Sequence, residues 1–142
     1  MSTGAALDAF IQLLAATTGL KVAVGRPEAG AGVFVWPWRI TENTYLKNRS
    51  LPTGSESSQA PRRLSHNIHI LIYVRPELTP DGLTGLDSVQ RAIAEHPVFH
   101  MNAGQTPVQL GVNEIPTEEL TAIHLAAGVP LSLCLGAILR FG

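Results

Sequence analysis

The segment HNIHILIYV, residues 66–74, most constrains what this chain can fold into. Its residues alternate with the period of two that is typical of a β-strand, whose successive side chains point to opposite faces. One face is entirely apolar and consists of Ile68, Ile70, Ile72 and Val74. The other face is mixed and consists of Asn67, His69, Leu71 and Tyr73. The sequence therefore predicts a long strand with one dry face, and a protein built around a sheet.

Three other segments have helical features. The first lies in the opening segment and carries Leu7, Phe10, Ile11 and Leu14 at the spacing of one helix face; it should end near Gly19. The second follows Thr79, a good N-cap, with Pro80 at its first position and Pro97 as its stop. Its apolar stripe consists of Leu83, Leu86, Val89 and Ile93. A third, shorter helix is expected between Thr117, as its cap, and Gly128.

Four further segments read as β structure: KVAVGRP, GVFVWPWRI, TPVQLGVNEIP and VPLSLCLGAILRFG. Pro37 cannot donate a ladder hydrogen bond, so the second segment should contain a bulge or lie at an edge. In the last segment one face is expected to carry Leu131, Leu133, Leu135, Ala137, Leu139 and Phe141. The order of elements predicts a single α+β domain over residues 1–142. We expect a largely antiparallel or mixed β-sheet flanked by two to three helices, mainly on one face.

Composition excludes several classes of function. The formal net charge of -1 gives no general field for attracting nucleic acid. The N-terminus lacks the features of a signal peptide, and no apolar run reaches the length of a membrane span, so a cytoplasmic protein is expected. Cys134 is the single cysteine, which forbids an intrachain disulfide and is expected to be a buried structural thiol.

The sequence contains no recognisable catalytic, cofactor or metal set. His66 and His69 are three residues apart on a strand and should point to opposite faces, so they cannot share an ion without a bulge. Pro97 breaks the spacing between His96 and His100. There is no nucleophile elbow and no glycine-rich phosphate loop with its lysine. We therefore expect no enzyme activity, no cofactor and no metal.

A polar segment after the second β segment is the candidate interaction site. It begins with ENTYLKNR and continues into LPTGSESSQAPRR, which is expected to be a flexible loop at about residues 50–63. Its arginine, tyrosine and asparagine side chains suit polar contacts with another protein better than phosphate binding, since Glu42 and Glu56 dilute the positive charge. The predicted interface residues are Asn43, Tyr45, Lys47, Asn48, Arg49, Arg62 and Arg63.

The ordered set of these segments resembles the DUF4255 family. The similarity runs from VFVWPWRITENTYLKNRSLP through RRLSHNIHILIYV and AIAEHPVF to PVQLGVNEIPTEELTAIHLAAGVPLSLCL. A polar motif of the family, E-N-x-x-L-x-N-R, is matched by Glu42, Asn43, Leu46, Asn48 and Arg49. His124 departs from the pattern where a bulkier aromatic residue is expected, and Pro37 interrupts a strand that usually alternates plainly.

The resemblance implies a structural cap, or tail terminator, of a contractile phage tail or a phage-tail-like injection particle. Such a protein is expected to form a homohexameric ring on the inner tube and sheath proteins and to stop polymerisation, after assembly in the cytoplasm. The resemblance is common to phages, bacteriocins and injection systems, and nucleic acid would enter only through a phage tail channel. Two alternatives stay open: an adaptor or ligand-binding module with a pocket lined by His69 and Tyr73, and an enzyme that uses His66, His69 or His96.

Overall fold

The computed structural model describes residues 3–27, 30–42, 66–76, 78–101 and 106–141. These residues form a six-stranded sheet in the spatial order β1-β2-β3-β6-β5-β4. The strands are β1 (Val22–Val24), β2 (Gly32–Glu42), β3 (His66–Arg75), β4 (Val98–Met101), β5 (Thr106–Val112) and β6 (Leu135–Phe141). The helices are α1 (Thr3–Thr18), α3 (Pro80–Glu95) and α4 (Thr117–Ala127). The predicted α+β class is confirmed.

The sheet is mixed, with one parallel pair. Strand β1 runs parallel to β2, and every other neighbouring pair is antiparallel. The predicted irregularity at Pro37 is confirmed as a shift in register between Pro37, which pairs with Ile70, and Arg39, which pairs with His69. Trp38 is the extra residue of this bulge. Because β1 pairs only with Val33–Val35, the part of β2 beyond the bulge has no strand beside it on that side within the described residues.

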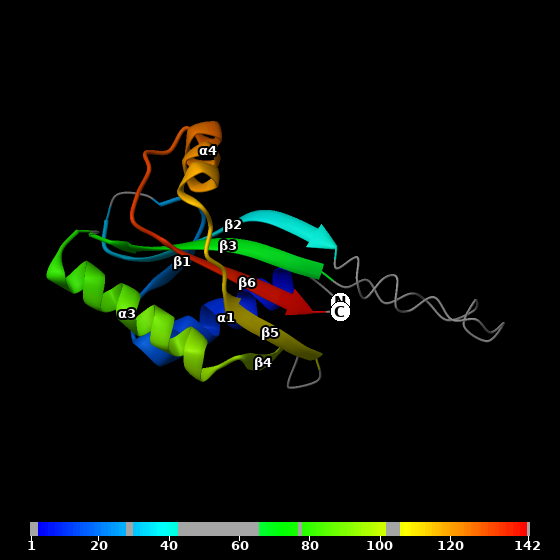
Figure 1. Ribbon diagram of the computed structural model, residues 1–142. Coiled ribbons are helices and arrows are strands. Elements are labelled where there is room, and N and C mark those ends of the chain that lie inside the picture. Colours follow the sequence, from blue (N-terminus) through cyan, green and yellow to red (C-terminus); the bar gives the residue numbers. More distant parts are fainter. Residues whose placement is uncertain (1–2, 28–29, 43–65, 77, 102–105, 142) are drawn as a thin grey trace, which may run out of the picture.

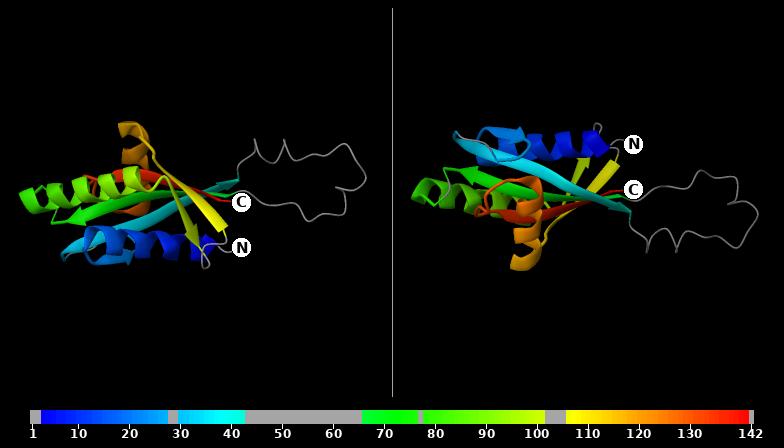
Figure 2. Two further views of the ribbon diagram at one scale, coloured as in Figure 1. Left: turned by 90° about the horizontal axis from the view of Figure 1, so that it is seen from below. Right: turned by 90° about the horizontal axis from the view of Figure 1, so that it is seen from above.

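Helices α1 and α3 cover one face of the sheet, which we call the inner face (Figures 1 and 2). The apolar side of β3 lies under them as predicted, and Ile70 and Ile72 are completely buried. Phe10 of α1 and Phe99 of β4 pack with their ring centroids 6.2 Å apart. Burial of this apolar surface is the main source of stability for the fold.

The helix boundaries follow local sequence signals, with one exception. The Thr79 hydroxyl accepts a hydrogen bond from the backbone N–H of Gly82 at 3.0 Å, so the predicted N-cap of α3 is confirmed. Gly128 ends α4 in the left-handed conformation, also as predicted. The prediction for Thr117 is wrong: Pro116 takes the cap position without a side-chain hydrogen bond, and Thr117 is the first helical residue. The acidic first turn of α4 offsets the missing cap through the helix dipole.

Two strand predictions need correction. Strand β4 was not expected, because its four residues follow Pro97 and are too short to show a period. Strand β6 begins only at Leu135, so Leu131 and Leu133 do not belong to its apolar face, and they are 54% and 41% exposed. From Ala137 to Phe141 the predicted alternation holds, with Leu139 in the core.

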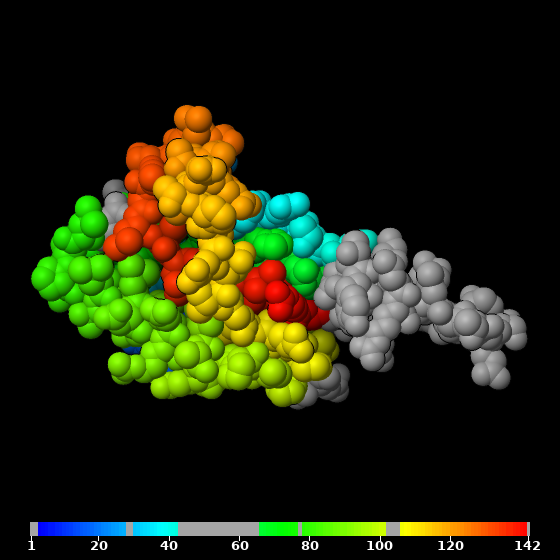
Figure 3. Space-filling view, viewed as in Figure 1, coloured from blue at the N-terminus to red at the C-terminus, as the bar shows by residue number. Residues whose placement is uncertain are grey.

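Helix α4 lies on the other, outer face of the sheet and stands out from the body of the molecule (Figures 1 and 3). It covers only part of this face. Leu71 and Tyr73, on the side of β3 that the sequence predicted to be mixed, are completely buried. The outer face continues past α4 towards the end of β2, the start of β3 and the end of β6. These strands are visible beside the helix in Figure 3.

Candidate interaction surfaces

The predicted interface residues all lie outside the described residues. Asn43, Tyr45, Lys47, Asn48, Arg49, Arg62 and Arg63 belong to the segment 43–65. This segment joins β2 to β3, and the two residues that flank it, Glu42 and His66, are register partners. The prediction that these side chains contact another protein therefore stays a prediction.

The histidines are spread over the fold. His66 and His69 point to opposite faces of β3, as the strand period predicted: the His66 ring stacks on Phe141 at 5.7 Å, whereas the His69 ring lies 5.7 Å from Trp38 on the outer face. His96 ends α3, and its Nδ1 lies 2.9 Å from the carbonyl oxygen of Ala92. Within the described part of the chain, no three histidine, cysteine, aspartate or glutamate side chains gather as metal ligands.

A buried pair of polar side chains anchors α4 to the sheet. Nδ1 of His124 lies 2.7 Å from the carbonyl oxygen of Leu120, which can only accept, so Nδ1 donates. In the neutral ring Nε2 is then the acceptor, and the Tyr73 hydroxyl donates to it at 2.7 Å. Trp36 packs edge-on against the same imidazole, with ring centroids 6.1 Å apart. His124 therefore fixes α4 to the sheet by a directional bond.

Replacing Tyr73 with Phe should lower the free energy of unfolding by about 1–2 kcal/mol, because His124 loses a buried donor. Chemical denaturation measures this change. As a control, Thr121→Val removes a hydroxyl on the exposed side of α4, which donates only to the carbonyl oxygen of Thr117, and should change stability by less than about 0.5 kcal/mol. Equal losses in both variants would contradict the role of the Tyr73–His124 bond as the anchor.

Beyond α4, two rows of side chains run across the outer face. In the first, Arg39, His69, Ile138 and Gly111 are successive register partners on β2, β3, β6 and β5. In the second, Thr41, Asn67, Arg140 and Gln109 follow in the same order. Neither row contains a carboxylate. We call this surface the bare face and define it as Trp38, Arg39, Thr41, Asn67, His69, Gln109, Ile138 and Arg140.

The bulge in β2 adds Trp38 to the bare face. Bulges re-aim side chains, and here the indole ring lies against His69. The indole Nε1 of Trp38 and the amide oxygen of Asn67 are buried atoms with no hydrogen-bond partner among the described residues. Such atoms are rare in folded proteins, because a buried polar group without a partner loses its bonds to water. A donor on β2 and an acceptor on β3 are thus left without a partner among the described residues.

His69 lies at the centre of the bare face. Its Nε2 is 3.0 Å from the Thr41 hydroxyl. Burial lowers the pKa of His69 below its usual value, and the positive charges of Arg39 and Arg140 lower it further, whereas Glu119 of α4 acts in the opposite direction. Both guanidinium groups therefore act on the same imidazole from the two strands that flank β3. Arg39 and Arg140 bring two positive charges to this part of the outer face, and neither row adds a carboxylate to them.

The lowered pKa of His69 predicts the direction of a pH effect. The folded protein binds the His69 proton less readily than the unfolded chain, so the contribution of this group to stability is present above the unfolded pKa of 6.5 and declines as the pH falls below it. His69→Gln should therefore reduce the acid-side loss of stability, measured by urea denaturation between about pH 7.5 and pH 5.5. Arg39→Gln should reduce the same loss of stability in part, because it removes one of the positive charges that lower the pKa of His69. An identical pH profile for wild type and His69→Gln would refute this assignment.

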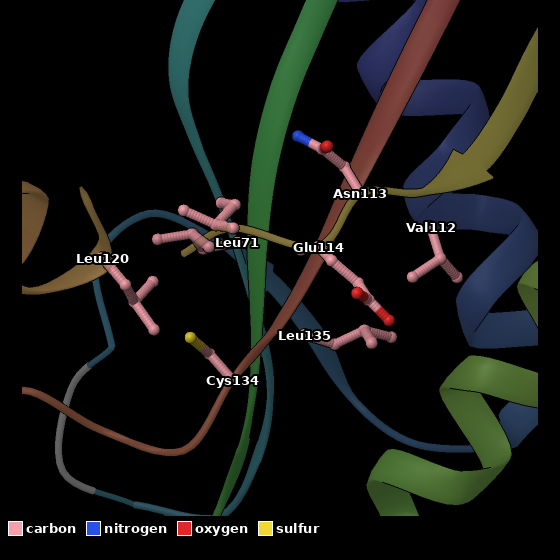
Figure 4. A pocket seen from close by; sticks show the side chains of 9 residues that line it. Leu71, Val112, Asn113, Glu114, Leu120, Cys134 and Leu135 are labelled. Carbon is pink, nitrogen blue, oxygen red and sulfur yellow. The ribbon is translucent and has the colours of Figure 1, made fainter. Parts of the chain in front are cut away.

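A pocket of about 290 Å³ lies between α4 and the sheet. Leu120 from α4 and Cys134 from the segment before β6 extend into it, and Leu71 lies on the sheet side (Figure 4). Cys134 is half-buried rather than buried as predicted. Neither His69 nor Tyr73 lines this pocket, and Tyr73 is completely covered. The burial of Tyr73 argues against the alternative of a ligand site with both residues in its wall.

The bare face could not be found from sequence motifs. Its charged residues, Arg39 and Arg140, are 101 positions apart in the chain (140 minus 39). They come together because β2 and β6 both pair with β3, and because the bulge shifts the register of β2. The available signal was the mixed side of β3, which carries His69 and Asn67.

The fold of this chain is similar to that of a sheath/tube terminator of a contractile injection system. The solved structure is the cryo-electron microscopy structure of this terminator, in its extended state, from PVC, an extracellular contractile injection system. The TM-score is 0.71, the likeness covers 99% of this chain, and the sequences are 14% identical. The chain spans 56% of the length of that terminator.

Comparison with protein-family models finds no match, and no curated protein matches the sequence. Membership of the DUF4255 family therefore stays a prediction. Within the described residues, no helix is long and apolar enough to cross a membrane.

Proposed function

We propose that this chain is a structural terminator that caps the inner tube and sheath of a contractile phage-tail-like particle. The whole chain would act as one domain, form a hexameric ring at the end of the tube, and stop polymerisation of tube and sheath. The observation that carries the proposal is the likeness to a sheath/tube terminator, because it extends over 99% of the chain. The protein would be assembled in the cytoplasm and would then remain in the particle.

The arrangement of elements supports this role. A ring requires heterologous contacts, in which one patch of a subunit meets a different patch of its neighbour. The chain has several distinct surfaces that could make such contacts: the projecting α4, the bare face, and the part of β2 beyond the bulge. Glu42 and His66, the described residues that flank the predicted interface segment, lie at the same end of the sheet as the bare face. The alternative of a ligand-binding module loses support, since Tyr73 is buried under α4.

The proposal is tested by negative-stain microscopy of tubes grown from the inner-tube protein of the same particle. With the wild-type chain present, tubes should be shorter and should carry ring-shaped density at one end. Tubes of unchanged length without end density would refute the proposed function. Mass photometry of the isolated chain then shows whether the ring exists before it meets a tube.

The double variant Asn48→Ala/Arg49→Ala should cap tubes poorly while its far-ultraviolet circular dichroism stays native, because it removes two polar side chains of the predicted interface and no apolar residue. A matched control is Gln90→Ala/Arg91→Ala, which removes an amide and a guanidinium from the exposed surface of α3. This control should cap tubes as the wild type does. Normal tube lengths with the Asn48/Arg49 variant would contradict the assignment of these residues to the interface.

A further inference from the structure

The residue types of the bare face are those of a surface that binds another protein. Arg39 and Arg140 are exposed, and they lie on either side of the half-buried residues of β3. Arginine and tryptophan are the residue types that most often dominate the energetics of protein interfaces. Here both types occur together on the bare face, where the Trp38 ring lies against His69.

The positive charges on the bare face favour a partner with negative charge. Arg39 and Arg140 have no carboxylate in either row of the bare face, and both guanidinium groups act on His69. Glu119 of α4 is the acidic group that acts on His69, and it comes from the border of the surface. A guanidinium pairs with a carboxylate through two parallel hydrogen bonds, which favours an acidic partner over a neutral one.

The unused hydrogen-bonding atoms indicate the shape of the partner. The indole N–H of Trp38 and the amide oxygen of Asn67 are buried and have no partner among the described residues, so their side chains must turn outward before a partner can bond to them. An extended peptide supplies an acceptor and a donor in alternation along its backbone. Next to Arg140, the same face has a hollow of about 300 Å³ whose walls include Val98 and Ile138, and it is large enough for an apolar side chain.

We propose that the bare face binds an acidic, extended segment of another protein subunit. Arg39 and Arg140 pair with its carboxylates, Trp38 and Asn67 bond to its backbone, and the hollow beside Arg140 takes one of its apolar side chains. The inference rests on the proposed function for the presence of such a subunit in the particle, and it names the chemistry that the subunit presents.

The test uses the full chain labelled with ¹⁵N and a short synthetic peptide of glutamate and glycine residues around one leucine. Addition of the peptide should shift the indole N–H resonance of Trp38 and the amide resonances of β3 and β6 around His69. Arg39→Ala/Arg140→Ala should weaken binding about tenfold. Trp38→Phe, which keeps an aromatic ring but removes the N–H, should weaken it roughly threefold to tenfold. The control Lys21→Ala/Arg91→Ala removes two exposed cations elsewhere and should bind as the wild type does.

Three results would overturn the inference. The first is no shift at Trp38, or equal binding of a peptide with glutamine in place of glutamate. The second is tighter binding of a single-stranded oligonucleotide of the same charge, which would assign the face to nucleic acid. The third is a shift that follows protein concentration without peptide, which would assign it to a second copy of this chain. Tube capping by the wild type is scored separately, so loss of capping would refute the proposed function and leave the peptide result standing.

Discussion

Ile70→Asp should prevent the chain from folding. Ile70 is completely buried in the middle of β3, and its side chain faces the core under α1 and α3. An aspartate there would be an unpaired charge in an apolar environment, or would have to take up a proton, and either state costs about 4 kcal/mol or more. This is a large part of the stability of a typical domain, which is about 5–15 kcal/mol. The measurement is near-ultraviolet circular dichroism together with the urea midpoint.

The matched control is Ile40→Asp. Ile40 lies on the neighbouring strand β2 and pairs with Ile68, but it is 55% exposed. The same substitution should therefore change the free energy of unfolding by about 0.5 kcal/mol or less. If Ile70→Asp were as stable as Ile40→Asp, the inner and outer sides of β3 would have to be exchanged, since a shift of one residue moves every side chain of a strand to the other face.

The core of the fold was predictable where the pattern is local. The alternation of Ile68, Ile70 and Ile72 requires only the geometry of one strand. Likewise, Thr79 with Pro80 and Gly128 act within a single turn of helix, and each signal was confirmed. Such predictions succeed because the physical cause lies within a few residues of the feature.

Predictions that depend on distant parts of the chain were less complete. Leu131 and Leu133 continue the alternation of β6 in sequence, yet β5 pairs with β6 only through Ala137 to Arg140, and the residues before Leu135 leave the sheet to reach α4. Strand β4 is stabilised by its pairing with β5 and by burial of Phe99 and Met101, neither of which is visible in a four-residue pattern. Tertiary context decides such segments.

The candidate site divides in the same way. The polar, basic segment between β2 and β3 can be recognised in the sequence alone, and the predicted interface residues come from it. The bare face cannot be recognised in the sequence, because Arg39 and Arg140 lie on either side of His69 only after three strands and a bulge have formed. Glu42 and His66, which flank that segment, lie at the same end of the sheet as the bare face.

Gly136→Ala should lower the free energy of unfolding by about 3 kcal/mol. A methyl group at Gly136 would overlap the backbone carbonyl oxygen of Asn113 and approach the side chain of Ile115 to 3.3 Å. The backbone N–H of Asn113 also donates to the carbonyl oxygen of Gly136 at 2.9 Å, so the two segments are already held together. The obstacle is a backbone atom that cannot rotate away, and relief requires a shift of the whole connection that leads from β5 into α4.

Because that connection carries α4, Gly136→Ala should also loosen the helix. Hydrogen exchange of the α4 amides should become faster, and tube capping should weaken if α4 contributes to the ring. Gly111→Ala is the control: Gly111 lies on β5 and pairs with Ile138, and an added methyl group there meets no heavy atom within 4 Å. Its stability should stay within about 0.5 kcal/mol of the wild type. Equal stability of the two variants would show that the contact between Gly136 and Asn113 does not hold the α4 connection in place.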